Sequence, residues 1–276
     1  MTSPPLLEAR NLRKTFSVPL GALANGASRS SGADGNGVAA VDGVSLELAP
    51  GETLAIVGES GSGKTTLARM LLRLIEPDSG ELLVEGRDFL AARGAELRAL
   101  RREMQMVFQD PFASLDPRMR VGSIVGEPLE IHEPKLSRAE RRSRVVEVLR
   151  ATGLAEDVLA RYPHEFSGGQ RQRIGIARAL VLRPRLVVAD EPVSALDVSV
   201  GAQILDLLQE LQRDFALTYL LISHSLPVVA QLATRIAVMQ GGRIVESGAA
   251  EQILRAPSHP YTQSLIAAIP SLSASI

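Results

Sequence analysis

Residues 58–65 have the types and spacing of a loop that binds phosphate groups. They fit the pattern G-x-x-x-x-G-K-[ST] at every required position. The residues are Gly58, Glu59, Ser60, Gly61, Ser62, Gly63, Lys64 and Thr65. Glycines let the backbone curl with its N–H groups pointing inward, and the N-terminus of a following helix attracts negative charge. Lys64 is therefore expected to reach the β- and γ-phosphates of ATP or GTP, and the Thr65 hydroxyl to ligate Mg²⁺.

The segments on either side of this loop support a nucleotide site. Residues 53–57 predict a short buried strand, and residues 66–72, which begin with Thr66, predict a helix with one apolar face. An ordinary Gly/Ser turn is the alternative, and it is disfavoured because every required position and both flanks are present. We therefore expect the loop, together with Thr66, to bind a nucleoside triphosphate.

Two adjacent carboxylates, Asp190 and Glu191, follow the continuous apolar run at 186–189. The run predicts a buried strand, and an acidic residue at its end is what a triphosphatase needs as its second acidic element. Asp190 is expected to hold Mg²⁺ through a water molecule, and Glu191 to orient or deprotonate the attacking water. Solvated carboxylates at a strand end are the alternative, but the phosphate loop upstream favours the catalytic assignment.

Gln109 and His224 also follow apolar runs, at 104–108 and 217–222. His224 could touch the γ-phosphate from its strand end, or it could be a structural residue beside a hydrophobic strand. The Gln109 amide could ligand Mg²⁺ or a water molecule, or it could cap its strand. The residue types alone leave both alternatives open.

These residues are expected to meet at one edge of a sheet. Four apolar strands alternate with helices, which indicates an α/β fold with a mostly parallel sheet covered on both faces. The strands are predicted at 53–57, 104–108, 186–189 and 217–222. Ligands of such sheets bind at the carboxyl ends of the strands, so the four distant sequence positions that follow these strands converge on one phosphate site.

The rest of the chain predicts further elements. Leu6 to Phe16 alternates weakly and predicts an edge strand, residues 20–40 predict a flexible surface loop, and residues 44–48 and 81–86 predict strands. Helices are predicted at 95–103, from Ser137 (which forms a capping box with Glu140), at about 167–182 and at about 199–214. The arginines of the helix after Ser137 are interleaved with glutamates, which indicates a solvated face rather than a nucleic-acid site.

Composition excludes several classes of protein. The 276 residues can form one large domain or two small ones, and a net charge of −1 gives no bulk attraction to nucleic acid. The absence of cysteine excludes disulfides, thiol catalysis and cysteine-bound metal clusters. The chain has no apolar run long enough to cross a bilayer and no signal-peptide layout, so we expect a cytosolic protein or one held at a membrane through a partner.

A second candidate anion site lies at 167–170. A serine N-cap and two glycines open a predicted helix there, and its residues are Ser167, Gly168, Gly169 and Gln170. A second phosphate-facing helix start is unexplained unless the nucleotide lies between two copies of such a subunit. The run from Ser167 to Arg173 resembles the signature motif of ABC ATPases, the nucleotide-binding subunits of ATP-driven transporters.

The other motifs follow in the order of that family. They are the phosphate loop at 58–65, the Q-loop glutamine Gln109, the segment Asp190-Glu191-Pro192, the D-loop ending at Asp197 and the switch histidine His224. Phe16 lies where the family has an aromatic residue that stacks on adenine. Ser225 departs from the family, in which aspartate is commoner after the histidine, and this puts little in doubt.

The resemblance implies a P-loop NTPase fold in which an antiparallel β edge and an inserted helical subdomain accompany the mostly parallel sheet. The whole chain, 1–276, is then one ABC-type domain. Its expected parts are a nucleotide-binding core at about 5–95 and 184–245, a helical signature subdomain at about 110–183 and a tail motif at about 246–276.

The tail narrows the resemblance to one branch of the family. The family match extends to 109–117 and 162–167, and Pro257 to Thr262 is similar to the tail motif of the oligopeptide, dipeptide and nickel importers. The intact Ser167–Arg173 run looks most like the second of the two ATPase subunits of such an importer. Some relatives hold an iron–sulfur cluster through cysteines in their C-terminal extension, but this chain has none, so no cluster is expected.

The resemblance also implies partners. A second, non-identical ATPase subunit closes head-to-tail with this one around two ATP molecules, each held between one phosphate loop and the other subunit's signature residues. Two transmembrane permease subunits are moved by this cycle at the cytoplasmic face of the inner membrane, and an extracytoplasmic binding protein delivers the solute. The stretch from Gln109 to about Leu129 belongs to the region expected to receive the coupling helix of a permease.

Two other functions compete with import. A soluble ABC ATPase of DNA repair or translation would have no membrane partner, but such proteins carry coiled-coil insertions or two ATPase units, which are absent here. A small-molecule kinase does not explain residues 167–170. The transported substrate is left open by the sequence.

Overall fold

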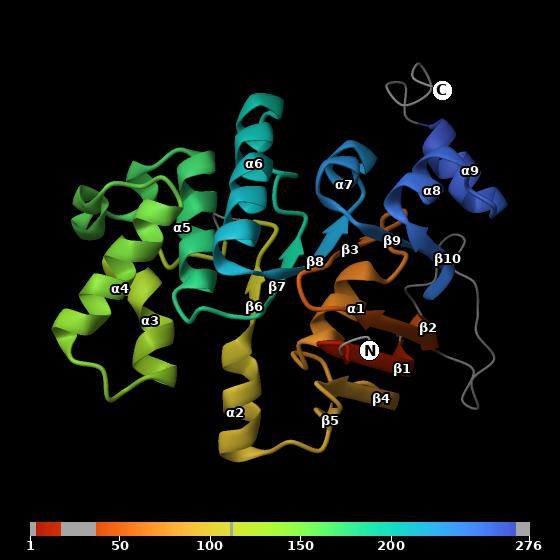
Figure 1. Cartoon of the computed structure of the whole chain (residues 1–276), viewed down its shortest axis with the longest axis horizontal. Coiled ribbons are helices and arrows are strands. Elements are labelled where there is room, and N and C mark those ends of the chain that lie inside the picture. Colours follow the sequence, from red (N-terminus) through yellow and green to blue (C-terminus); the bar gives the residue numbers. More distant parts are fainter. Residues whose placement is uncertain (1–3, 18–36, 111–112, 269–276) are drawn as a thin grey trace. The chain divides into compact units, whose positions relative to one another are not determined.

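The computed structural model describes residues 4–17, 37–110 and 113–268 (Figure 1). The chain divides into two compact units, which are described separately. Unit 1 comprises Met1–Ala92 and Leu221–Ile276, and unit 2 comprises Arg93–Leu220. Unit 1 contains the phosphate loop and the tail, and unit 2 contains the signature segment and the predicted catalytic carboxylate.

An antiparallel sheet of four strands lies in unit 1, in the order β2-β1-β4-β5. Its strands are β1 (Leu7–Ser17), β2 (Gly37–Leu48), β4 (Ser79–Val84) and β5 (Arg87–Asp88). The predicted strand at Leu6–Phe16 is confirmed, but its edge position is wrong, because β1 pairs with β2 on one side and with β4 on the other. The alternation that suggested an edge comes from one exposed face of a strand with two neighbours.

The predicted loop at 20–40 is only partly testable. Residues 18–36 lie outside the described residues, whereas Gly37 to Ala40 form the beginning of β2, so the loop prediction is wrong for those four residues. The sequence Gly-Val-Ala-Ala has mostly small side chains and therefore resembles the loop before it. In the structure this segment pairs with the end of β1 from Thr15 to Ser17.

A second set of strands in unit 1 carries the phosphate loop. β3 (Thr53–Val57), with all five residues buried, is parallel to β9 (Arg235–Gln240), which is antiparallel to β10 (Arg243–Ala249). The phosphate loop joins β3 to α1 (Lys64–Leu71), as predicted. The other helices of unit 1 are α7 (Leu226–Leu232), α8 (Ala250–Arg255) and α9 (Pro260–Ala267).

The strands of unit 2 confirm the predicted apolar runs. β6 (Met104–Val107) is parallel to β7 (Leu186–Asp190), with Met104 opposite Leu186 and Val107 opposite Ala189. β8 (Thr218–Ser223) follows in the order β8-β7-β6, and the division between the units falls within it. Because every residue of β7 and β8 is buried, these strands have continuous apolar patterns rather than alternating ones.

The helices of unit 2 include one that the sequence did not predict. The predicted helices are present as α2 (Gly94–Glu103), α4 (Arg138–Ala151), α5 (Gly168–Leu180) and α6 (Val198–Phe215). The additional helix is α3 (Val121–His132), which packs against α4 and α5; short 3₁₀ turns cover Glu156–Ala160 and Pro163–Glu165. The capping box at Ser137 and Glu140 is confirmed, since each side chain accepts a hydrogen bond from the other's backbone N–H.

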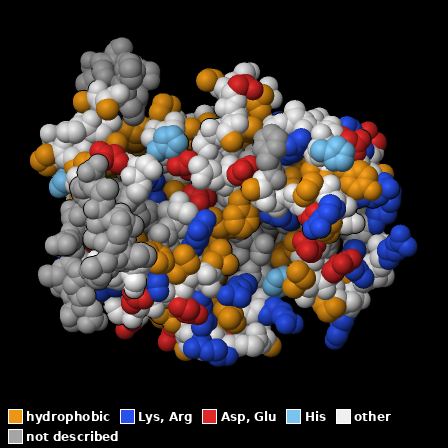
Figure 2. All heavy atoms as spheres, turned by 180° about the vertical axis from the view of Figure 1, so that it is seen from behind, with side chains coloured by type: hydrophobic (Ala, Val, Ile, Leu, Met, Phe, Trp, Pro, Cys, Tyr) orange, Lys and Arg blue, Asp and Glu red, His pale blue; other side chains and the backbone are white. Residues whose placement is uncertain are grey.

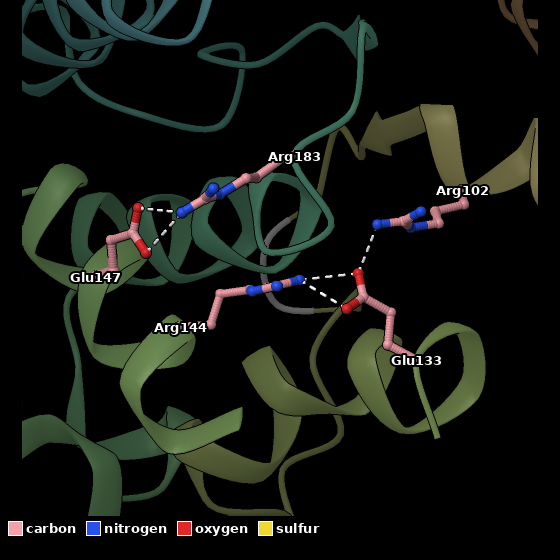
Figure 3. Close-up of polar contacts among 5 residues, drawn as sticks. All are labelled: Arg102, Glu133, Arg144, Glu147 and Arg183. Atoms are coloured by element: carbon pink, nitrogen blue, oxygen red, sulfur yellow. Dashed lines mark hydrogen bonds and ion pairs between the residues drawn. The ribbon is translucent and has the colours of Figure 1, made fainter. Parts of the chain in front are cut away.

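Ion pairs connect the helices of unit 2 (Figure 3). Glu133, just after α3, accepts from Arg102 of α2 at 2.7 Å and from Arg144 of α4 at 2.8 Å. Glu147 of α4 accepts from Arg183, beyond α5, at 2.8 and 3.0 Å. Over these helices, Figure 2 shows Lys and Arg side chains interspersed with Asp and Glu side chains. Every helix in the described part of the chain is too short or too polar to cross a lipid bilayer.

Candidate nucleotide site

Two glycines of the phosphate loop are required by close backbone contacts. Gly58 has φ +153°, and a Cβ there would lie 2.1 Å from the Met239 carbonyl oxygen. Gly63 has φ +104°, and a Cβ there would lie 2.0 Å from the Ala40 carbonyl oxygen. Any side chain at either position would collide with backbone, so the strands β9 and β2 fix the path of the loop.

The side chain of Lys64 turns back into the phosphate loop. Its side chain is buried, and Nζ donates hydrogen bonds to the carbonyl oxygens of Gly58 at 2.8 Å and Glu59 at 2.7 Å. Thr65 and Thr66 are half-buried in the first turn of α1. The ammonium group, the loop backbone and the helix N-terminus are therefore together in unit 1, as a triphosphate site requires.

Two other predicted site residues belong to unit 1. Phe16 lies on β1 with 41% of its surface exposed, and Lys14 Nζ is 5.9 Å from its ring centre. His224 is exposed between β8 and α7. The neighbouring Ser223 Oγ accepts a hydrogen bond from the Ser225 N–H at 2.9 Å, which forms the turn that presents the histidine. An exposed ring and an exposed imidazole are both accessible to a ligand.

In unit 2, Gln109 and Glu191 are brought together. Gln109 Nε2, beyond the end of β6, donates a hydrogen bond of 2.9 Å to Glu191 Oε2, beyond the end of β7. Glu191 has φ +47°, a left-handed conformation that costs of order 1–3 kcal/mol for a residue with a Cβ. Asp190, the last residue of β7, is 97% buried, with 3% of its surface exposed. Backbone strain at such a position commonly accompanies a functional constraint.

The signature segment and the D-loop aspartate also lie together in unit 2. Ser167 caps α5 through a reciprocal pair of hydrogen bonds with Gln170, and Asp197 caps α6 by accepting from the Val200 N–H at 2.9 Å. A Cβ on Gly169 would lie 2.4 Å from Val200 Cγ1, so only glycine lets the two helix starts approach so closely. A Cβ on Gly168 would lie 3.3 Å from the Leu196 side chain.

The proposed metal ligands are compatible with Mg²⁺ but do not form a protein-only metal site. Among residues 4–17, 37–110 and 113–268, no group of three or more His, Asp or Glu side chains could hold a metal. Thr65, Gln109 and Asp190 supply a hydroxyl, an amide and a single carboxylate. Each of these groups offers an oxygen ligand of the kind that Mg²⁺ takes, and Mg²⁺ is usually held by one or two carboxylates together with substrate phosphates.

Sequence reasoning missed the residues that hold the site from outside its motifs. Met239 fixes Gly58, and Tyr261 accepts a hydrogen bond from the Glu59 N–H at 3.0 Å. In unit 2, the guanidinium of Arg178 donates to the Ser114 carbonyl at 2.6 Å and lies over the Phe108 ring; burial lowers its pKa. Of these residues, only Tyr261 belongs to a motif that the sequence shows, the tail motif at 257–262. The sequence does not indicate which residue Tyr261 contacts.

Comparison with known families agrees with this geometry. Residues 41–194 match the family model described as ABC transporter, and residues 245–276 match the model described as oligopeptide/dipeptide transporter, C-terminal region. The first match covers the phosphate loop and the signature segment, and the second covers the tail.

Individual relatives lead to the same family. The dipeptide transport ATP-binding protein DppF of Lactococcus lactis subsp. cremoris is 54% identical, over 84% of this chain and 75% of that protein. DppF of Haemophilus influenzae is 51% identical, over 98% and 79%. The dimeric ATP-binding cassette MJ0796, solved in a post-hydrolysis state with ADP and Pi, has a TM-score of 0.75 and 29% identity, over 88% of this chain and 98% of that one. The chain therefore belongs to the ABC transporter family, as the ATP-hydrolysing subunit of an oligopeptide/dipeptide importer.

Proposed function

We propose that Glu191 is the general base of ATP hydrolysis and that Gln109 orients it. The hydrogen bond between these residues is the observation that carries the assignment, since it joins two strand ends that are 82 residues apart. Glu191 takes the proton of the attacking water, and Gln109 holds one carboxylate oxygen in place. His224, exposed at its strand end, is assigned to the γ-phosphate, and Phe16 to the adenine ring.

Lys64, the loop backbone and Thr66 bind the phosphates, and Thr65, Gln109 and Asp190 hold Mg²⁺. When bound, the ion neutralises charge on the β- and γ-phosphate oxygens. The lysine in unit 1, held by the loop carbonyls, then contacts phosphate oxygens, which are stronger acceptors because they are charged. Asp190 has only 3% of its surface exposed, so the surrounding atoms restrict the movement of its side chain.

A second ATPase subunit completes the site in this proposal. Ser167, Gly168, Gly169 and Gln170 form a second helix start that is suited to phosphate, in a chain that already has one phosphate loop. Val198, next to the D-loop residue Asp197, has 93% of its surface exposed. The start of α6 is therefore accessible to a partner subunit.

Exchanging the signature serine tests this proposal. Ser167→Arg should lower the ATPase rate of the assembled complex by about 10²-fold or more, because the lost donor contacts the triphosphate held by the partner. ATP affinity of the isolated subunit should not change. Ser137→Arg is the matched control: Ser137 caps α4 with the same capping-box geometry, so it should cost similar stability without affecting hydrolysis.

A Ser167→Arg subunit that loses ATP affinity as strongly as a Lys64→Ala subunit would contradict the shared site. That result would place the signature serine against the ATP of its own subunit.

Two permease subunits and an extracytoplasmic binding protein complete the transporter, and the chain lies at the cytoplasmic face of the inner membrane. A cavity of about 600 Å³ in unit 2 supports permease docking, because it opens beside the stretch from Gln109 to Leu129. Gly122 and Gly126 of α3 and Arg138 and Arg141 of α4 contribute to its lining. A cysteine at Ser123, an exposed residue of the lining, should cross-link to a permease subunit in native membranes; absence of cross-linking there would contradict docking at this cavity.

A further inference from the structure

The C-terminal tail contacts the phosphate loop through a hydrogen bond. Tyr261, in the first turn of α9, accepts at Oη from the backbone N–H of Glu59 over 3.0 Å. The two residues are 202 positions apart in the sequence. Both belong to unit 1, so the contact lies within one compact part of the chain.

This hydrogen bond holds a peptide group that Lys64 also holds. The N–H that Tyr261 receives and the Gly58 carbonyl that accepts from Lys64 Nζ at 2.8 Å belong to the same planar peptide unit. Partners at the two opposite edges of one peptide unit restrict its rotation. A change in the Tyr261 contact is therefore transmitted directly to the carbonyl that positions the lysine ammonium.

The tail is itself anchored to the strand β10. Glu246 accepts hydrogen bonds from Ser258 N and Ser258 Oγ, both at 2.7 Å, and from His259 N at 3.1 Å. His259 Nδ1 then accepts from the Tyr261 N–H at 3.2 Å and caps α9. On the inner face of α9, Thr262 is buried. The start of α9, from which Tyr261 contacts the loop, is thus held to β10 by the hydrogen bonds of Glu246.

We infer that Tyr261 is a positioning residue for nucleotide binding, and that the tail motif stabilises the phosphate loop in the conformation that places Lys64. This inference rests on the proposed role of the phosphate loop. The phenol ring need not touch the nucleotide, because its hydroxyl acts through the Gly58–Glu59 peptide.

The variant Tyr261→Phe removes the hydroxyl and keeps the ring. Loss of one neutral hydrogen bond should raise the Kd for ATP and the KM by about three- to tenfold. The kcat of the assembled transporter should stay within about twofold, because the lost contact supports binding rather than the chemical step. Tyr219→Phe is the matched control: it removes a hydroxyl bond of 3.1 Å to the Leu208 carbonyl in unit 2, and should lower thermal stability without changing the Kd.

A second variant tests the anchor. Glu246→Gln should also raise the Kd for ATP, and Tyr261→Phe added to it should raise the Kd by less than it does alone, because both changes act through the same contact. An unchanged Kd in Tyr261→Phe, or an equal rise in Tyr219→Phe, would overturn the inference.

The Lys64→Ala variant, measured in the same series, separates the two proposals. If Lys64→Ala abolishes ATP binding while Tyr261→Phe leaves it unchanged, the tail inference fails and the phosphate-loop assignment stands. If Lys64→Ala binds ATP normally, both fail.

Discussion

Gln109 Nε2 and Glu191 Oε2 are 2.9 Å apart, in a hydrogen bond between the residues that follow the parallel strands β6 and β7. The pairing of Val107 with Ala189 brings these strand ends into register, so the geometry of the sheet sets the contact. Glu191 reaches Gln109 from a left-handed backbone conformation. A base held by an amide donor keeps its orientation while it accepts a proton, which is the property that water activation needs.

Lys64→Ala is expected to abolish tight ATP binding without unfolding the protein. Lys64 makes two short hydrogen bonds to loop carbonyls, and in the proposed complex the same ammonium contacts the phosphates. Loss of charge-assisted contacts should raise the Kd for ATP by about 10²-fold or more. Lys135→Ala, at an exposed position in unit 2, is the control and should bind normally. Normal affinity in a folded Lys64→Ala sample would refute the assignment of the loop.

Glu133→Gln is expected to lower the free energy of unfolding by about 1–2 kcal/mol, because it weakens hydrogen bonds to two arginines at a side chain that is only 16% exposed (Figure 3). Glu147→Gln changes a pair whose side chains are 49% and 58% exposed, and should cost less than about 0.5 kcal/mol. Urea titrations of the two variants provide the comparison. Equal losses would show that burial does not decide the strength of these pairs.

Glu246 makes the stability of the tail dependent on pH. Burial alone would raise its pKa, but the neighbouring Thr262 hydroxyl and the donors of Ser258 and His259 outweigh burial and lower the pKa to about 2, from 4.5. A lowered pKa means that the stabilisation is complete above about pH 4.5 and is lost as the pH falls from there towards 2. The difference in unfolding free energy between wild type and Glu246→Gln should therefore shrink across this range. A difference that stays constant between pH 7 and pH 2.5 would contradict this role of the carboxylate.

The nucleotide-binding elements were the most predictable part of the fold. β3, β6, β7 and β8 are buried along their whole or nearly whole length, and their apolar runs are bounded by chemically distinctive residues. The helix caps at Ser137 and Ser167 could also be predicted, because a capping box depends on residues only three positions apart. Local patterns of this kind can be recognised in the sequence without knowledge of tertiary contacts.

Other elements could not be predicted because their signal is weak or non-local. α3 has apolar residues at Val121, Ile124, Val125 and Leu129, which is helical spacing, but Gly122, Gly126 and Pro128 obscure it. The pattern of β1 predicts an edge strand because it does not reveal a second neighbour. The contact between Tyr261 and Glu59 joins residues 202 positions apart, and no local pattern encodes it.

The ATPase rate of Glu191→Gln, measured together with its ATP dissociation constant, tests the catalytic assignment most directly. The substitution keeps the size of the side chain and its capacity to hydrogen-bond but removes the base, which typically costs ~10²–10⁴ in rate. Glu210→Gln, at an exposed position on α6, is the matched control and should hydrolyse ATP normally.

The reconstituted complex with its partner subunit is the right sample, because both composite sites are then present. We predict that hydrolysis from the site containing Glu191 collapses while ATP affinity is unchanged or higher, and that the ATPase pair becomes a stable dimer with Mg²⁺-ATP but not with ADP. Hydrolysis at near wild-type rate from that site would contradict the account and remove Glu191 from the mechanism.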